Sequence, residues 1–180
     1  MSTLERFVSN VRSSWGPMST ELVAACQQQL DDLVNADCSE QWLALLHLEA
    51  AVQKELYRDP EHGFILLAYT EPAGLYRQPH DHGRGWAIYA VQHGAVEVGT
   101  YARIEDQNGD VKLIKRGSTV IHAGESQVYL PGDIHDTRCL GSQALIFRLT
   151  DRDLKKEDKE ARRMTRYVEQ AGNWVPETRQ

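Results

Sequence analysis

Residues 79–83 read PHDHG, a stretch in which two imidazoles stand two positions apart. In an extended segment, positions i and i+2 point to the same face, so His80 and His82 can hold one ion between them. Later in the chain, residues 130–135 read LPGDIH, where a Pro-Gly turn ends one strand and makes His135 the first inward residue of the next. Because antiparallel strands bring distant positions side by side, we expect His135 to complete a metal site with His80 and His82.

An HxH pair alone is a weak signal, because surface strands carry histidines by chance and this chain has seven of them. Two alternatives stay open: the three are hydrogen-bonded histidines of the core, or the domain has lost its metal. Neutral imidazoles suit iron, zinc, copper and nickel, so they do not select one ion. Three ligands leave positions open for substrate and oxygen, which is typical of a catalytic site.

The sequence around these motifs has the pattern that is typical of antiparallel β-structure. From Gly63 onward, apolar runs are short, rich in β-branched and aromatic residues, and separated by turn signals such as His93-Gly94 and Arg116-Gly117. The expected strands are 64–70, 85–91, 95–104, 111–115, 118–122, 126–130 and 144–149. So many short strands predict a sandwich or barrel.

Helical patterns flank this region. Ser19-Thr20-Glu21 opens an amphipathic run, and a second helix is expected over 40–57, stopped by Asp59-Pro60. The mixed-charge segment 151–170 predicts a solvated helix packed against the barrel by a thin apolar face. We expect a single domain over 1–180, with a helical cap (1–60), a β-barrel (61–150) and a C-terminal helix and tail (151–180).

Composition restricts the partners and the compartment. The chain has 180 residues and a formal net charge of -6, which argues against a nucleic-acid partner because phosphate binding needs a basic face. No apolar stretch is long enough for a membrane span, and the N-terminus has no apolar signal core. The three cysteines are too few and too scattered for a disulfide framework, so we expect a cytoplasmic protein.

The PHDH motif and the segment from Gly124 to His135 resemble the two characteristic motifs of the cupin superfamily. Within it, the chain is most similar to the cysteine dioxygenase-like group of thiol dioxygenases and their metal-dependent relatives, over about Leu56 to Leu149. The resemblance implies a mainly β fold, the cupin double-stranded β-helix or jelly-roll barrel, with helices ahead of it. Many cupins carry a glutamate ligand after the HxH; here Trp86 and Ala87 take its place, as in that group.

One departure concerns the reaction. Thiol dioxygenases carry a Ser-x-His-x-Tyr pattern on the late strand, where this chain has residues 146–150, IFRLT. The serine, histidine and tyrosine are absent, which puts sulfur oxygenation in doubt while leaving the fold and the metal site.

Three neutral histidines leave the charge of a divalent ion uncompensated, so the centre favours an anionic ligand. We expect iron(II), with zinc, nickel and manganese as alternatives, and oxygen insertion into a small anionic thiol or carboxylate substrate. Alternatives on the same scaffold are a metal-dependent lyase, isomerase or hydrolase, and a non-catalytic small-molecule-binding cupin. The oligomeric state stays open, with a homodimer as one option, because cupins often pair their barrels edge to edge.

Arginines would anchor such a substrate, since the guanidinium fork pairs with a carboxylate. The candidates are Arg58, Arg77, Arg84 and Arg148. The resemblance favours Arg58, and Arg148 takes the place of an inward-pointing histidine. His122 is a candidate acid–base group, with a buried core histidine as the alternative. Either Tyr89 or Ile88 faces inward, but strand parity does not choose between them, because residues 83–85 can hold a bulge.

Overall fold

The computed structural model describes residues 1–178 and is mainly β, as expected. The helices in that range are α1 (Thr3–Ser14), α2 (Thr20–Val34), α3 (Gln41–Glu49) and α4 (Leu154–Lys159). The strands are β1 (Lys54–Arg58), β2 (Ile65–Pro72), β3 (Tyr76–His80), β4 (Ala87–Glu105), β5 (Val111–His122), β6 (Ser126–Tyr129), β7 (Ile134–Thr150), β8 (Tyr167–Gln170) and β9 (Asn173–Pro176). No helix among these residues has the length and apolarity needed to cross a membrane.

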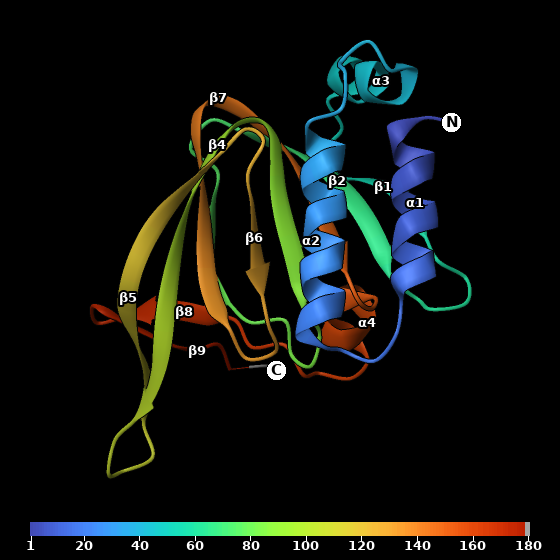
Figure 1. Ribbon diagram of the computed structural model, residues 1–180. Coiled ribbons are helices and arrows are strands. Elements are labelled where there is room, and N and C mark those ends of the chain that lie inside the picture. Colours follow the sequence, from blue (N-terminus) through green and yellow to red (C-terminus); the bar gives the residue numbers. More distant parts are fainter. Residues whose placement is uncertain (179–180) are drawn as a thin grey trace.

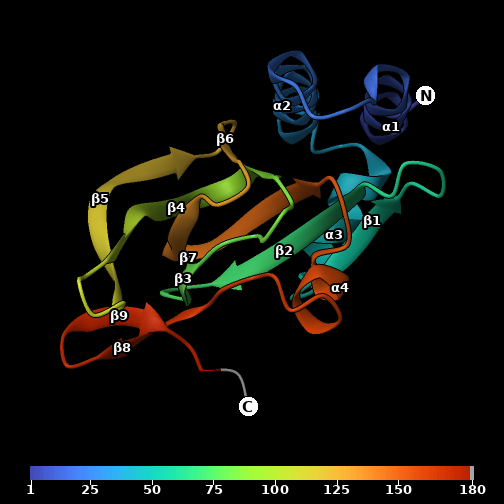
Figure 2. The same cartoon turned by 90° about the horizontal axis from the view of Figure 1, so that it is seen from below.

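One antiparallel sheet carries most of the strands. They run in the order β1-β2-β7-β4-β5, while β3 pairs with β7 and β6 pairs with β4. The long strands β4 and β7 form its spine, with Ala87 opposite Thr150 at one end and Tyr101 opposite Ile134 at the other. Figures 1 and 2 show this sheet strongly curved, with α1 and α2 on one side of the molecule and the β8–β9 hairpin on the other.

Two predicted turns lie inside continuous strands. The sequence predicts a break at His93-Gly94, but β4 runs through it with register shifts on both sides of His93. Gly94 has φ 81°, and a Cβ there would lie 2.3 Å from the carbonyl oxygen of Gln143, so the glycine marks a β-bulge. Strand β5 likewise continues through Arg116-Gly117. The four strands expected over 85–104 and 111–122 are therefore two.

The helical region is shorter than predicted. Helix α2 begins at the predicted signal, where the Ser19 side chain accepts a hydrogen bond from the Leu22 N–H. The helix expected over 40–57 is wrong beyond Glu49: Ala50 adopts a left-handed conformation with φ 43°, and the chain then forms β1. Pairing of β1 with β2 satisfies the backbone of residues 54–58, which overrides the local helical pattern.

The C-terminal segment also departs from the prediction of one helix over 151–170. Helix α4 is confined to Leu154–Lys159, and residues 167–176 form the β8–β9 hairpin. Tyr167 is buried there against Tyr101, Leu113 and Ile134. Burial of this aromatic ring under the sheet stabilises the extended hairpin over further helix.

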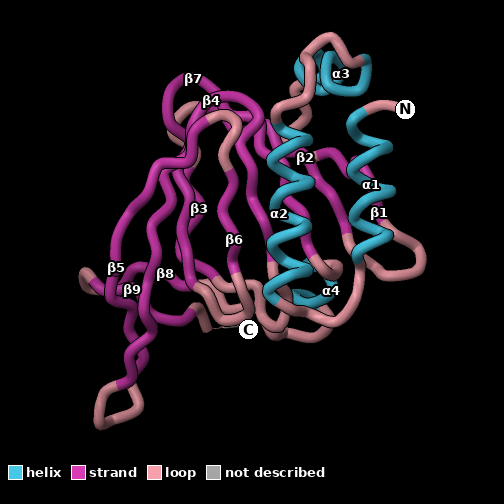
Figure 3. Tube along the Cα trace, viewed as in Figure 1, coloured by secondary structure: helices cyan, strands magenta, loops and turns pink. Residues whose placement is uncertain are grey.

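Helices α1, α2 and α3 cover the outer face of the sheet. Figure 3 shows α1 and α2 on one side of the strands, whereas α4 lies across the sheet from them in Figure 2. The apolar faces of α1, α2 and α3 join β2, β4 and β7 in one core, which includes Phe7, Val11, Cys26, Leu30, Leu33, Phe64, Trp86, Ile88 and Phe147. A separate cluster fills part of the inner face, with Val91, Val96, Val98, Ile121, Tyr129, Cys139 and Ile146. Alternate residues of β4 therefore serve two cores, because successive side chains point to opposite faces.

Replacing Leu30 tests how strongly α2 is bound to the sheet. The side chain is fully buried, so Leu30→Ala removes its burial and leaves a cavity, and we expect a loss of about 2–5 kcal/mol of unfolding free energy. Leu48, which is 80% exposed on α3, offers a matched control: Leu48→Ala should change stability by less than about 0.5 kcal/mol. Urea unfolding followed by circular dichroism measures both. If Leu30→Ala and Leu48→Ala were equally stable, the packing of α2 against the sheet would be contradicted.

Candidate metal centre

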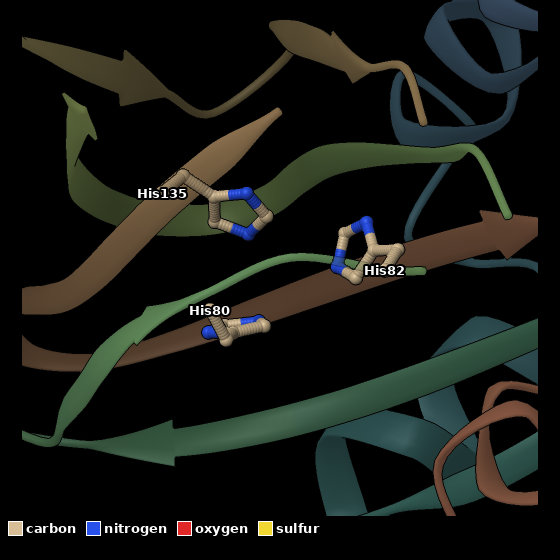
Figure 4. Close-up of side chains that lie close together, drawn as sticks. All are labelled: His80, His82 and His135. Atoms are coloured by element: carbon tan, nitrogen blue, oxygen red, sulfur yellow. The ribbon is translucent and has the colours of Figure 1, made fainter. Parts of the chain in front are cut away.

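The three predicted histidines meet at one point of the sheet. His80 ends β3, His82 lies two residues further in the loop toward β4, and His135 is the second residue of β7. Because β3 pairs with β7, His80 stands opposite His135 in register. Each residue offers one ring nitrogen such that these atoms all lie within 4.8 Å of one another. Figure 4 shows the three side chains converging from these segments.

Burial and missing hydrogen bonds fit this cluster to a metal ion. His82 and His135 are 1% and 0% exposed. Both ring nitrogens of His135 and Nδ1 of His82 are buried without a hydrogen-bond partner. Leaving such groups unpaired costs free energy, so the site calls for a bound atom that accepts their lone pairs. The Nδ1 of His80 lies 2.9 Å from the Gln78 carbonyl oxygen; donation to it leaves Nε2 as the ligand atom.

The same burial keeps the imidazoles in the form that binds metal. Removal from water lowers the pKa of His80 below its usual 6.5 and lowers the pKa values of His82 and His135 well below it. Neighbouring positive charge, including that of Arg148, acts in the same direction. The three imidazoles are therefore neutral near pH 7, as metal-binding histidines must be.

A cavity of about 520 Å³ opens beside the histidines. It is lined by Gln53, Tyr69, Glu71, Tyr76, Arg77, Gln78, His80, His82, Tyr89, Ile146, Arg148, Leu154, Lys155, Asp158, Met164 and Arg166. Two of its cations are neutralised within the wall, because Arg77 lies 2.8 Å from Glu71 and Arg166 pairs with Asp158. The size and the mixed lining suit a small polar molecule.

Arg148 lies in this wall, as expected from its position on the late strand. It stands opposite Tyr89 in the β4–β7 ladder, and its guanidinium carbon lies 5.1 Å from the centre of the Tyr69 ring and 6.0 Å from that of Tyr89. Its Nε is buried without a hydrogen-bond partner. No carboxylate among residues 1–178 forms an ion pair with it. The aromatic faces hold the cation by cation–π contact and leave donors for a ligand.

The structure does not bring the other two predicted catalytic residues to the cavity. Arg58 lies on β1 and pairs with Glu55 and Asp153, each at 2.8 Å, outside the cavity lining. Its strand is at the edge of the sheet, and these carboxylates already satisfy its guanidinium. His122 is exposed at the end of β5, so neither an acid–base role at the histidines nor the alternative of a buried core histidine fits its position.

Two tyrosines, Tyr89 and Tyr129, lie beside the histidines, and the sequence pattern alone assigned neither of them to the site. Tyr89 faces the cavity while Ile88 packs in the helix-covered core, which settles the parity left open by residues 83–85. The Tyr89 hydroxyl lies 3.4 Å from Nε2 of His82, and its ring stacks on that imidazole at 19°. Tyr129 packs its ring 3.9 Å from that of His135. Alternation along β4 identifies Tyr89 once Ile88 is assigned to the core.

The lowered histidine pKa values predict how the metal-free protein responds to acid. Below pH 6.5 the unfolded chain binds protons at these positions that the folded chain does not, so the free energy of unfolding should fall as the pH drops from 7.5 to 5.5. In His135→Leu the decrease should be shallower, whereas the exposed-site control His122→Leu should keep the wild-type decrease. Urea unfolding in the presence of a chelator measures the free energy of unfolding at each pH. An identical dependence on pH in all three proteins would refute the buried neutral cluster.

Comparison with known proteins gives a likeness of fold. No family model matches the chain, and no curated protein matches it. Among solved structures, KdgF from Halomonas sp. is 20% identical over 54% of this chain and 74% of its own, with a TM-score of 0.43. A recombinant oxalate oxidase in complex with glycolate is 24% identical over 50% of this chain and 42% of its own, with a TM-score of 0.40. The cupin domain of Schizosaccharomyces pombe Cnp3 is 11% identical over 61% and 69%, with a TM-score of 0.44. These likenesses concern the β fold alone, and at these scores they carry no argument about function.

Proposed function

We propose that this protein is a mononuclear metal enzyme of the cupin type, an oxygenase that acts on a small anionic thiol or carboxylate. One observation carries the proposal: three histidines, two of them buried with unpaired ring nitrogens, converge beside a cavity whose wall holds Arg148 without a carboxylate partner. The histidines bind the ion, and the arginine binds the acid group of the substrate.

His80, His82 and His135 are the residues that would hold the metal, for which iron(II) is our first choice and zinc, nickel or manganese are the alternatives. A bound divalent ion supplies a positive charge for an anionic substrate group and, if it is iron, the means to activate oxygen. Three protein ligands would leave coordination positions of the ion free for substrate.

Arg148 has the properties of a substrate anchor. Its guanidinium presents donors in a fixed fork that matches a carboxylate, and Tyr69 and Tyr89 hold it against movement. The Tyr89 hydroxyl lies beside His82, between this anchor and the metal ligands, so it can donate a hydrogen bond to a group bound there. Arg148 and Tyr89 thus orient a small acid so that the end opposite its carboxylate points toward the histidines.

A second candidate is Lewis-acid chemistry without oxygen, as in a lyase, isomerase or hydrolase. The observation that favours it lies on β7, where Ile146 and Arg148 line the cavity in place of the Ser-x-His-x-Tyr pattern of thiol dioxygenases. Such an enzyme needs only a redox-inert divalent ion and an oriented substrate.

Metal content decides whether the site is a metal centre at all. We expect about one equivalent of iron per chain in protein purified without chelators, and a loss of it in His80→Ala, because two remaining imidazoles bind too weakly. Elemental analysis measures both, with His122→Ala as the matched histidine control. No metal in either protein would refute the metal centre.

The two reaction classes are separated by their need for oxygen. With a panel of small thiol, hydroxy and keto carboxylates, we expect oxygen consumption that requires iron and stops in His80→Ala. Turnover under nitrogen with zinc in the site would instead establish the Lewis-acid alternative. Tight ligand binding without turnover in any metal form would make the chain a binding module and contradict both enzymes.

Substitution of Arg148 should weaken substrate binding and leave the metal in place. Loss of a charge-assisted hydrogen-bonded pair costs about 1.5–3 kcal/mol, so Arg148→Gln should raise the Kd for a small carboxylate by about 10-fold or more. Arg58→Gln is the control, because Arg58 lies outside the cavity and should leave the Kd unchanged. Calorimetric titration of metal-loaded protein measures both; equal effects of the two substitutions would remove Arg148 from the anchor role.

A further inference from the structure

The loop that carries His82 is bound to the C-terminal segment of the chain. We infer that residues 151–166 are an integral part of the metal site, and that the carboxylates of Asp151 and Glu157 are positioning residues that hold His82 in place to bind the ion. The inference rests on the proposed metal site and assigns new residues to it. It is carried by backbone contacts, by the two carboxylates and by two glycines.

Backbone hydrogen bonds attach the segment to the HxH motif itself. The Asp81 N–H donates to the Thr165 carbonyl oxygen at 3.0 Å, and the Thr165 N–H donates to Asp81 Oδ1 at 2.9 Å. His80 and Arg166 form an antiparallel β-bridge beside this pair. Asp81, which lies between His80 and His82, is therefore fixed to the C-terminal segment through both its backbone N–H and its carboxylate.

The loop that follows His82 has no strand partner until β4 begins at Ala87, so its backbone amides need other acceptors. Local bonds serve two of them: the Gly83 N–H donates to Asp81 Oδ1, and the Gly85 N–H donates to the His82 carbonyl oxygen. The other two depend on the C-terminal segment. The Arg84 N–H donates to Glu157 Oε1 at 3.2 Å, and the Trp86 N–H donates to Asp151 Oδ1 at 3.0 Å.

The carboxylates of Glu157 and Asp151 are largely shielded from solvent, and each lies close to an arginine. The side chain of Glu157 is 7% exposed, with Arg84 Nε 3.5 Å from Oε1 and Arg163 Nη1 3.8 Å from Oε2. The side chain of Asp151 is 12% exposed and lies 2.8 Å from Nη2 of Arg152. A charged acceptor forms a stronger hydrogen bond to a backbone amide than a neutral one does, and burial removes competing water.

Two glycines allow the close approach. A Cβ on Gly83 would lie 3.1 Å from both the Arg163 carbonyl group and Glu157 Cγ, and its φ is 62°. A Cβ on Gly85 would lie 3.0 Å from Leu154 Cδ2 and 3.1 Å from Asp151 Oδ1. The loop and the segment therefore fit each other at van der Waals distance only without side chains at these positions.

The same segment also builds the cavity wall, to which it contributes Leu154, Lys155, Asp158, Met164 and Arg166. Metal ligands and substrate wall are thus joined in one unit by Asp151 and Glu157. A metal centre needs its ligands held within a fraction of an ångström, so release of the loop should lower metal affinity even where the fold survives.

Zinc(II) binding by the full chain tests this. With Glu157→Leu, which keeps the volume and removes the acceptor, we expect the Kd for zinc to rise about 10-fold or more, the cost usual for residues that support metal ligands. Asp151→Leu should behave in the same way. Glu157→Gln keeps an acceptor oxygen for the Arg84 amide, so its affinity should recover to within about threefold of wild type. Glu160→Leu, an exposed position on the same segment, is the matched control.

Competition with a chromophoric chelator gives the Kd, and circular dichroism of the metal-free proteins establishes which variants fold. If the wild-type protein does not bind zinc, the metal centre itself is refuted, whatever the variants do. If the wild type binds zinc and a folded Glu157→Leu or Asp151→Leu binds it equally well, the positioning role is overturned. Unfolding of both leucine variants would likewise overturn it, since the two carboxylates would then serve the stability of the whole fold and not the position of His82.

Discussion

Everything at the site depends on the register in which β3 pairs with β7. That pairing sets His80 opposite His135, and a shift by one residue would turn one imidazole to the other face of the sheet. The register is held next to His135 by Asp136, which is buried and accepts hydrogen bonds from the Gly99 N–H and from the hydroxyls of Tyr76 and Tyr101. One carboxylate thus joins β3, β4 and β7 directly behind the site.

The Asp136 contact also shows how this register is made specific. A Cβ on residue 99 would lie 2.4 Å from Asp136 Oδ1, so only glycine admits the carboxylate to the backbone of β4. Burial and the hydrogen bond to Asp136 raise the pKa values of Tyr76 and Tyr101, which therefore stay protonated donors. A buried polar network of this kind is stable only when every member is satisfied, which excludes neighbouring registers.

The local sequence pattern was enough to predict those features that depend on the alternation of side chains along a strand and on the spacing of the histidines. The clustering of the three histidines, the β-strand pattern and the inward position of Arg148 follow from period-two geometry and from residue chemistry. What failed depends on distant partners. His93-Gly94 resembles a turn until β7 runs beside it as a continuous strand, and residues 54–58 continue a helical pattern until β2 offers hydrogen bonds. Arg58 and Arg148 looked equivalent, because no local pattern reveals that Glu55 and Asp153 neutralise the first alone.

The balance of charge around the cavity gives the proposed function its substrate. Glu71 is paired with Arg77 and Asp158 with Arg166, the three imidazoles are neutral, and Lys155 is exposed to water, so Arg148 is the half-buried cation of the lining that lacks a counterion. A divalent ion on the histidines would add a second centre of positive charge in the same small space. Two separated cationic centres in low dielectric are best compensated by one molecule with an acid group at one end and an anionic or electron-rich donor at the other. A small carboxylate with a thiol, hydroxyl or keto group nearby has that form, whichever reaction follows.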